Sequence, residues 1–283
     1  MNPLSKNLLA VSSEPELFQS QKFRSLPGVT HVITGRQGGS SQGKCSSLNI
    51  AFNGWDDSRN VRRNRQRIFT KLHVKPDQVF FQEQVHRDTI SLVEEKWAAT
   101  SALSEEAFIP QTDAMITVRP NIVLAAKAAD CLLIALFDAH NPTVAIIHAG
   151  WRSTMLGLAV KTVKKMLTIS GSEPQNLHAV FSPSAGPCCY EVGPELLAQA
   201  QQNQFVKPIH FVYKNDQSET GKRRLFFDLW AANRDQIRST GVPSESIDNA
   251  EICTMCFHEH FFSYRHDGPE VGSHAMMIWL QDQ

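Results

Sequence analysis

Short apolar runs rich in branched side chains recur along this 283-residue chain, and polar segments separate them. Runs of this length and composition are typical of β-strands. The pattern therefore predicts a fold built mainly on sheets. The predicted strands span residues 29–34, 79–81, 113–118, 122–126, 132–137, 143–148, 179–182, 209–213, 261–264 and 275–280.

Segments with a helical spacing of apolar residues lie between these runs, as Val61, Ile68 and Leu72 illustrate. Strands and helices do not alternate strictly, and no glycine-rich nucleotide loop follows a strand. This disfavours a Rossmann domain or a P-loop enzyme. We expect an α/β (α+β) domain with mixed sheets inside and helices outside. The predicted helices follow Asp57 and Ser153 and cover residues 191–202 and 227–240.

The chain has no linker, repeat or low-complexity tract that would divide it, so one domain is expected. We assign residues 23–283 to that domain and residues 1–22 to an N-terminal extension. Hydrophobic residues make up 42% of the chain and charged residues 20%, as in soluble globular proteins.

The charge balance argues against nucleic-acid and membrane partners. Lys plus Arg and Asp plus Glu both count 28, so the formal net charge is zero. No apolar run approaches the ~18 residues of a membrane span, and residues 1–21 lack the pattern of a signal peptide. We expect a cytoplasmic monomer or homodimer.

A cysteine and a histidine stand at the ends of two successive predicted strands. Cys131 precedes the strand at 132–137, and His148 ends the strand at 143–148. One hairpin return would bring the two side chains together, as a thiolate–imidazole pair or a shared metal ion requires. The alternative is a small buried cysteine and a histidine satisfied within the core.

His86, after the apolar run at 79–81, is a third candidate. Two histidines and one thiolate would give zinc three protein ligands and leave the fourth position open, as in catalytic zinc sites. Zinc in such a site lowers the pKa of its bound water to about 7.

The C-terminal part of the chain contains a rival metal motif. Cys253, Cys256, His258 and His260 form a Cys-x-x-Cys-x-His-x-His pattern, and on a strand the last three would share one face. The spacing is tighter than in common structural zinc motifs, and partly exposed strand histidines are the alternative. The adjacent pair Cys188-Cys189 is interpreted as structural or incidental. Six cysteines are too few and too irregular for a disulfide scaffold.

Three segments combine small residues with an arginine and resemble anion-binding loops. They are residues 34–41 with Arg36, residues 150–154 with Arg152 and residues 263–265 with Arg265. Glycine backbone N–H groups and an arginine fork can hold a phosphate. The alternative is a Gly38-Gly39 turn and solvated arginines.

Taken in order, ten motifs resemble the laccase-domain family, first labelled multicopper polyphenol oxidoreductases and now viewed as zinc-dependent purine nucleoside phosphorylases, with some members linked to peptidoglycan editing. The resemblance covers about residues 29–280. The motifs are Thr34-Gly-Arg-Gln-Gly-Gly-Ser-Ser41, Ser47-Leu-Asn-Ile50, Asn64-Arg65, Gln84-Val-His86, Ala129-Asp-Cys131, His148-Ala-Gly-Trp-Arg152, Gly186-Pro-Cys-Cys-Tyr-Glu-Val-Gly193, Asp228-Leu229, Cys253-Thr254 and Phe261-Phe-Ser-Tyr-Arg265.

The resemblance implies a single αββα layered domain, similar to the catalytic domain of cytotoxic necrotizing factors. It also implies one zinc ion held by His86, Cys131 and His148, and the cleavage of adenosine, inosine, guanosine or methylthioadenosine with phosphate, together with adenosine deamination. We assign substrate and phosphate binding to Arg36, Asn49, Arg152 and Arg265.

The chain departs from the family pattern at several positions. His266 and Ser273 stand where arginine is usual, Ser153 and Ser182 where glycine is usual, and Ala129 where threonine usually precedes Asp-Cys. Two cationic donors are thus replaced, which predicts a weaker activity or a shifted specificity.

The resemblance leaves two other function classes open for the same residues. A cysteine or zinc amide hydrolase that edits peptidoglycan precursors would use Cys131 as nucleophile and His148 as base. A nucleoside-binding or scaffold protein would keep the fold without turnover. A multicopper oxidase is disfavoured, because only His258 and His260 among 11 histidines form a His-x-His pair.

Overall fold

The computed structural model describes residues 7–94, 101–215 and 223–281. Within these residues the strands form two large sheets and one hairpin. The seven-stranded sheet has the order β1 (Leu8–Ser13), β2 (Glu16–Ser20), β3 (Val29–Thr34), β15 (His274–Leu280), β8 (Val123–Ala128), β4 (Val79–Gln82) and β6 (Phe108–Ile109). The six-stranded sheet has the order β14 (Ile247–Asn249), β11 (Leu177–Phe181), β9 (Leu132–Asp138), β10 (Thr143–Ala149), β7 (Ala114–Thr117) and β5 (Ile90–Leu92). The hairpin pairs β12 (Phe211–Asn215) with β13 (Arg223–Phe227).

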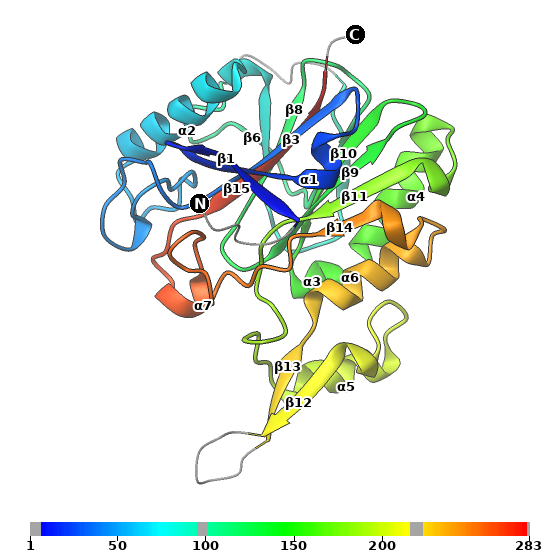
Figure 1. Cartoon of the computed structure of the whole chain (residues 1–283). Coiled ribbons are helices and arrows are strands. Elements are labelled where there is room, and N and C mark those ends of the chain that lie inside the picture. The colour runs from blue at the N-terminus through cyan, green and yellow to red at the C-terminus, as the bar shows by residue number, and fades with distance from the viewer. Residues whose placement is uncertain (1–6, 95–100, 216–222, 282–283) are drawn as a thin grey trace.

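Helices cover the outer faces of the stacked sheets. The helices are α1 (Gln21–Arg24), α2 (Ser58–Leu72), α3 (Trp151–Met155), α4 (Leu158–Ser170), α5 (Pro194–Gln202), α6 (Leu229–Arg238) and α7 (Tyr264–Asp267). Helix α2 packs on the seven-stranded sheet, whereas α4 and α6 pack on the six-stranded sheet (Figure 1). A third apolar cluster fills the space between the sheets. These layers confirm the predicted α/β domain with mixed sheets between helices.

The central strand pair β9–β10 shows how the pattern produces these layers. In β10, Ala145 and Ile147 pack toward the helices, and Val144 and Ile146 pack between the sheets. Successive side chains of a strand point to opposite faces, so His148 continues the inner row. The antiparallel register pairs His148 with Leu133. Cys131, just before β9, also packs against the inner cluster.

The predicted N-terminal extension contributes two strands to the seven-stranded sheet. Strand β2 pairs with β3, and β1 pairs with β2. Residues 1–6 of the extension and residues 282–283 of the predicted domain lie outside the described residues. The boundary at 22/23 stays a prediction.

One predicted strand is wrong. Residues 261–264 form a turn that leads into α7, although Phe261 and Phe262 are fully buried. The Ser263 side chain accepts a hydrogen bond from the His266 N–H and so caps the helix. Burial in a packed turn produces the same apolar run as burial in a strand.

The helices of the described residues are all too short or too polar to span a bilayer.

His31 in β3 makes the folded state sensitive to acid. It is 1% exposed, and its Nε2 accepts the Ser20 N–H at 2.8 Å. Burial lowers the pKa of His31 from 6.5 to about 3. Between these pH values the unfolded chain binds a proton that the folded chain does not, so folding stability falls as the pH falls below 6.5.

We therefore predict that His31→Gln, which keeps an acceptor for the Ser20 N–H, makes the pH dependence of unfolding shallower. The expected change in slope approaches about 1.4 kcal/mol per pH unit below 6.5. Urea unfolding of both proteins across this range measures it. The exposed His140→Gln serves as control and should keep the wild-type slope. Equal slopes for wild type and His31→Gln would contradict the prediction.

Candidate metal centre and cavity

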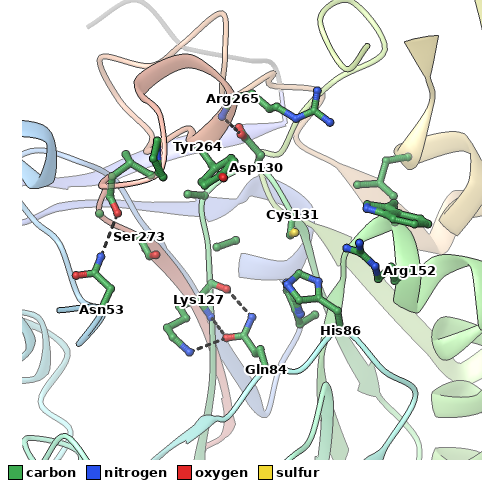
Figure 2. A pocket seen from close by; sticks show the side chains of 18 of the residues that line it. Asn53, Gln84, His86, Lys127, Asp130, Cys131, Arg152, Tyr264, Arg265 and Ser273 are labelled. Carbon is green, nitrogen blue, oxygen red and sulfur yellow. Dashed lines mark hydrogen bonds between the residues drawn. The ribbon is translucent and has the colours of Figure 1, made fainter. Parts of the chain in front are cut away.

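A cavity of about 610 Å³ opens where β8, β9 and β10 meet the loops that precede β5 and β15. His86, Cys131 and His148 line it, as do Arg152 and Arg265. Cys131, His86 and Arg152 lie beside one another in this cavity (Figure 2).

The structure brings His86, Cys131 and His148 together. One ligand atom from each lies within 4.8 Å of the others. The two imidazole rings meet edge to face, with centroids 4.8 Å apart. Cys131 and His148 come from the ends of the β9–β10 hairpin, whereas His86 comes from the loop after β4. Two histidines and a thiolate match a zinc ligand set with an open fourth position.

Asp113 orients both histidines. Its carboxylate contacts His148 Nδ1 at 2.8 Å and accepts the backbone N–H groups of Val85, His86 and Arg87 at 3.2, 3.0 and 2.7 Å. Holding His148 Nδ1 leaves Nε2 for a metal, which is the usual carboxylate–histidine arrangement around zinc.

The surroundings of His148 and His86 shift their pKa values in opposite directions. Burial alone lowers the pKa of His148, but Cys131 and Asp113 outweigh it and raise the pKa to about 9. Burial and the neighbouring His148 lower the pKa of His86 to about 4. His86 Nδ1 is buried and has no hydrogen-bond partner among the described residues. A neutral imidazole with an unused buried nitrogen fits a metal ligand.

Gly150 leaves the space that the His86 and Cys131 side chains need. A Cβ at this position would lie 2.9 Å from His86 Nδ1 and 3.1 Å from Cys131 Sγ. Gly150 also precedes the first turn of α3 as its N-cap residue.

Three cationic side chains line the same cavity: Lys127, Arg152 and Arg265. Burial lowers the pKa of Lys127 to about 8, and its Nζ donates to Gln82 O at 3.2 Å and to Gln84 Oε1 at 3.3 Å. The Arg152 guanidinium lies 4.3 Å from the Trp151 ring centroid.

Asp130 holds the segment that carries Arg265. Its carboxylate accepts the Arg265 N–H at 2.7 Å and the Thr254 hydroxyl at 2.6 Å. Burial raises the pKa of Asp130 above its usual value. The Arg265 guanidinium donates to Glu191 O at 2.9 Å. This hydrogen bond fixes the direction of the Arg265 side chain at the cavity.

Two predicted binding residues lie outside the cavity wall. The Arg36 guanidinium donates to the carbonyl groups of Ser46 and His258 and pairs with Asp267 at 2.6 Å. Asn49 is fully buried, and its Oδ1 accepts the N–H of Ser273, a residue that does line the cavity. Both side chains therefore support loops in this structure, and their assignment to substrate binding stays a prediction.

The departures from the family pattern also fall mostly outside the cavity. Ser153 and Ser182 are fully buried, and Ser182 Oγ accepts the Leu133 N–H at 3.0 Å within the sheet. His266 stacks on His258 with ring centroids 3.7 Å apart. Of the two lost arginine positions, only Ser273 lines the cavity.

The rival metal motif does not form. Its cysteines and histidines lie in a turn rather than a strand, and they separate into different neighbourhoods. His258 gathers with His266 and Asp267, whereas His260 Nδ1 contacts Glu16 Oε1 at 2.6 Å. Cys253 and Cys256 instead meet Cys188 and Cys189.

Lys127, Gln84 and several aromatic residues were not predicted as site residues. Lys127 is a charged residue within an otherwise apolar strand, a signal that could have identified it. The aromatic residues carry no comparable pattern, because they come from four separate segments of the chain. They are Trp55, Trp151, Tyr190 and Tyr264.

Comparison with known proteins connects this site to a family. The model of the family described as multi-copper polyphenol oxidoreductase laccase matches residues 30–281. The chain belongs to this family. The chain is 31% identical over 265 residues to a purine nucleoside phosphorylase of Bacteroides thetaiotaomicron, covering 94% of this chain and 96% of that one.

The chain is also similar over most of its length to an enzyme named as a deaminase and to a solved structure. The chain is 31% identical over 262 residues to "Adenosine deaminase RL5" from an unknown prokaryotic organism, covering 91% and 96% of the two chains. The crystal structure of the Bacillus licheniformis hypothetical protein YfiH superposes with a TM-score of 0.87 at 27% identity, covering 98% of this chain and 100% of that one.

We predict that Asp113→Asn weakens the binding of added zinc at this candidate site by about 10- to 100-fold, because an amide nitrogen cannot accept the N–H groups that the carboxylate holds. Competition with a chelator of known affinity measures this change. Asp88→Asn removes a carboxylate that pairs with Lys161 on the surface and should leave zinc affinity unchanged. An unchanged affinity in Asp113→Asn would show that the carboxylate does not orient the ligands.

Proposed function

We propose that this chain is a zinc-dependent purine nucleoside phosphorylase, which cleaves adenosine, inosine, guanosine or methylthioadenosine with phosphate. One observation carries the proposal: a single cavity joins three metal-ligating side chains to the cationic groups of Lys127, Arg152 and Arg265. The names of related proteins, several of them purine nucleoside phosphorylases, support it.

His86, Cys131 and His148 would hold the metal. Zinc in this position supplies a Lewis acid beside the cavity. The unused Nδ1 of His86 and the Asp113-oriented ring of His148 fit this role. The ligand set favours zinc because zinc accepts mixed histidine and thiolate ligands with one position left open.

The cationic groups would bind phosphate and hold it against the sugar. Arg152 and Arg265 offer planar forks for two phosphate oxygens, whereas Lys127 acts as a point charge. Asp130 and the Glu191 carbonyl oxygen fix the direction of Arg265 before the substrate enters. Such preorganised charges stabilise the negative charge of an attacking phosphate without rearrangement during the reaction.

Aromatic side chains would bind the purine ring of the nucleoside. Trp55 and Tyr264 are about half exposed at the mouth of the cavity, and Tyr190 lies buried within it. Flat aromatic faces can stack on a purine ring. The volume of about 610 Å³ lies within the range of small-molecule sites.

Adenosine deamination is a second candidate activity, which the name of the relative RL5 favours. An amide hydrolase would use the same residues differently, with Cys131 as a free nucleophile. A thiolate bound to a metal is not free to attack, so the loss or retention of one zinc ion in Cys131→Ala separates the two mechanisms.

The deciding experiment incubates zinc-loaded protein with adenosine or inosine, with and without phosphate, and follows free base, ribose 1-phosphate and ammonia. Base release that requires phosphate is expected, and ammonia from adenosine would add the deaminase activity. No product from any nucleoside would reject the proposal.

We further predict that Cys131→Ala loses turnover and about one zinc ion per chain. Cys45→Ala changes a buried cysteine that does not line the cavity and should lose neither. Loss of turnover with retention of this zinc ion would contradict the shared ligand and favour Cys131 as a nucleophile.

Lys127 gives the phosphate step a pH dependence. Its pKa of about 8 means that the ammonium form, which attracts phosphate, is lost as the pH rises above 8. We predict that the KM for phosphate rises above this pH in the wild type and that Lys127→Arg, which keeps its charge, reduces this rise. Steady-state kinetics from pH 6 to about 10 test it. The exposed Lys164→Arg is the control, and identical profiles for wild type and Lys127→Arg would exclude this role.

A further inference from the structure

Four cysteines from two distant loops meet beside the cavity. Cys188 and Cys189 lie in the turn after β11, and Cys253 and Cys256 lie in the turn after β14. Their sulfur atoms all lie within 4.8 Å of one another, and Cys256 Sγ is 3.6 Å from Cys188 Sγ and 3.4 Å from Cys189 Sγ. All four are free thiols.

These distances resemble a tetrahedral metal site more closely than disulfides. Zinc–sulfur bonds of about 2.3 Å in a tetrahedron place the sulfur atoms about 3.8 Å apart. A disulfide would bring two sulfur atoms to about 2.05 Å, much closer than the 3.6 and 3.4 Å that separate Cys256 Sγ from the sulfur atoms of Cys188 and Cys189. A cluster in which every sulfur lies close to the other three suits one shared ion.

The backbone supplies a second, independent observation. Cys253 Sγ accepts the Gly186 N–H at 3.3 Å, and the N–H groups of Met255 and Cys256 also donate to this sulfur. Amide donors directed at a cysteine sulfur stabilise the thiolate form that a metal requires. The Cys253–Cys256 spacing is the Cys-x-x-Cys spacing common in zinc sites.

A positive charge lies close to the same cluster. Lys214 Nζ donates to the carbonyl oxygen atoms of Pro187 at 2.6 Å and Cys188 at 3.2 Å. Four thiolates around one divalent ion carry a net charge of about −2, and a nearby ammonium group partly balances it.

We propose that Cys188, Cys189, Cys253 and Cys256 bind a second zinc ion, with a structural role. The site is closed, because four protein sulfur atoms fill the tetrahedron and leave no position for substrate. It differs in this respect from the His86, Cys131 and His148 centre, and it does not depend on the function proposed above.

The second zinc would clamp two walls of the cavity together. Tyr190 directly follows Cys189 and lines the cavity. Thr254 directly follows Cys253, and its hydroxyl holds Asp130. Without the metal, only a few hydrogen bonds join these turns, among them Thr254 N to Ser184 O at 3.0 Å. The ion would therefore fix the position of Tyr190 relative to Asp130.

Metal analysis of purified protein tests the proposal. The double variant Cys188→Ser/Cys256→Ser changes two exposed residues and should contain about one zinc ion per chain less than the wild type. Cys45→Ser, outside both groups, should keep the wild-type zinc content. A double variant with undiminished zinc would overturn the proposal.

Two measurements on the wild-type chain keep the test valid if the double variant does not fold. Cobalt-substituted protein should show thiolate-to-cobalt absorption roughly fourfold stronger than a centre with one thiolate would give, because each cobalt–sulfur bond contributes. Thiol titration of the denatured, unreduced and metal-free chain should find all six thiols of the sequence. Absorption of a single thiolate, or a deficit of two thiols that reveals a disulfide, would overturn the proposal.

Discussion

The carboxylate of Asp113 joins the parts of the site that the fold brings together. It contacts the His148 ring and receives three successive backbone N–H groups of the loop that carries His86. The Asp113 carbonyl oxygen also accepts the His148 N–H at 2.7 Å. Burial alone raises the pKa of Asp113, but the hydrogen bonds from His148 and Arg87 outweigh it and hold the pKa below its usual value. An ionised carboxylate thus lies between the end of β10, which carries His148, and the loop that carries His86.

The layered fold and the core of the site could be predicted from local patterns. Strand alternation placed Val144 and Ile146 on one face and so also determined where His148 points. Cys131 precedes β9 and His148 lies near the end of β10. These strands follow each other in the chain and form a hairpin, which brings the two residues together. Short sequence separation is what made this part of the site accessible to prediction.

The remaining parts depend on contacts between distant segments, for which a single sequence carries no signal. Arg36 lies among small residues, as a phosphate-binding arginine would, yet its partners include the His258 carbonyl group and the Asp267 carboxylate from the far end of the chain. Neither of the cysteine pairs at 188–189 and 253–256 indicates the other in the sequence, and they form one group only after β11 and β14 pair. Phe261 and Phe262 show the same limit, because an apolar run reports burial but not backbone shape.

The candidate metal centre depends on the absence of a side chain at Gly150, whereas the fold does not. Because the β9–β10 hairpin is held by its own register, a bulkier residue at this position could be accommodated by moving the loop of His86 or the turn of Cys131 while both sheets persist. A descendant of this chain could therefore lose the candidate metal centre in one substitution and remain a folded protein. The residue at this position is a simple marker for deciding which relatives retain the centre.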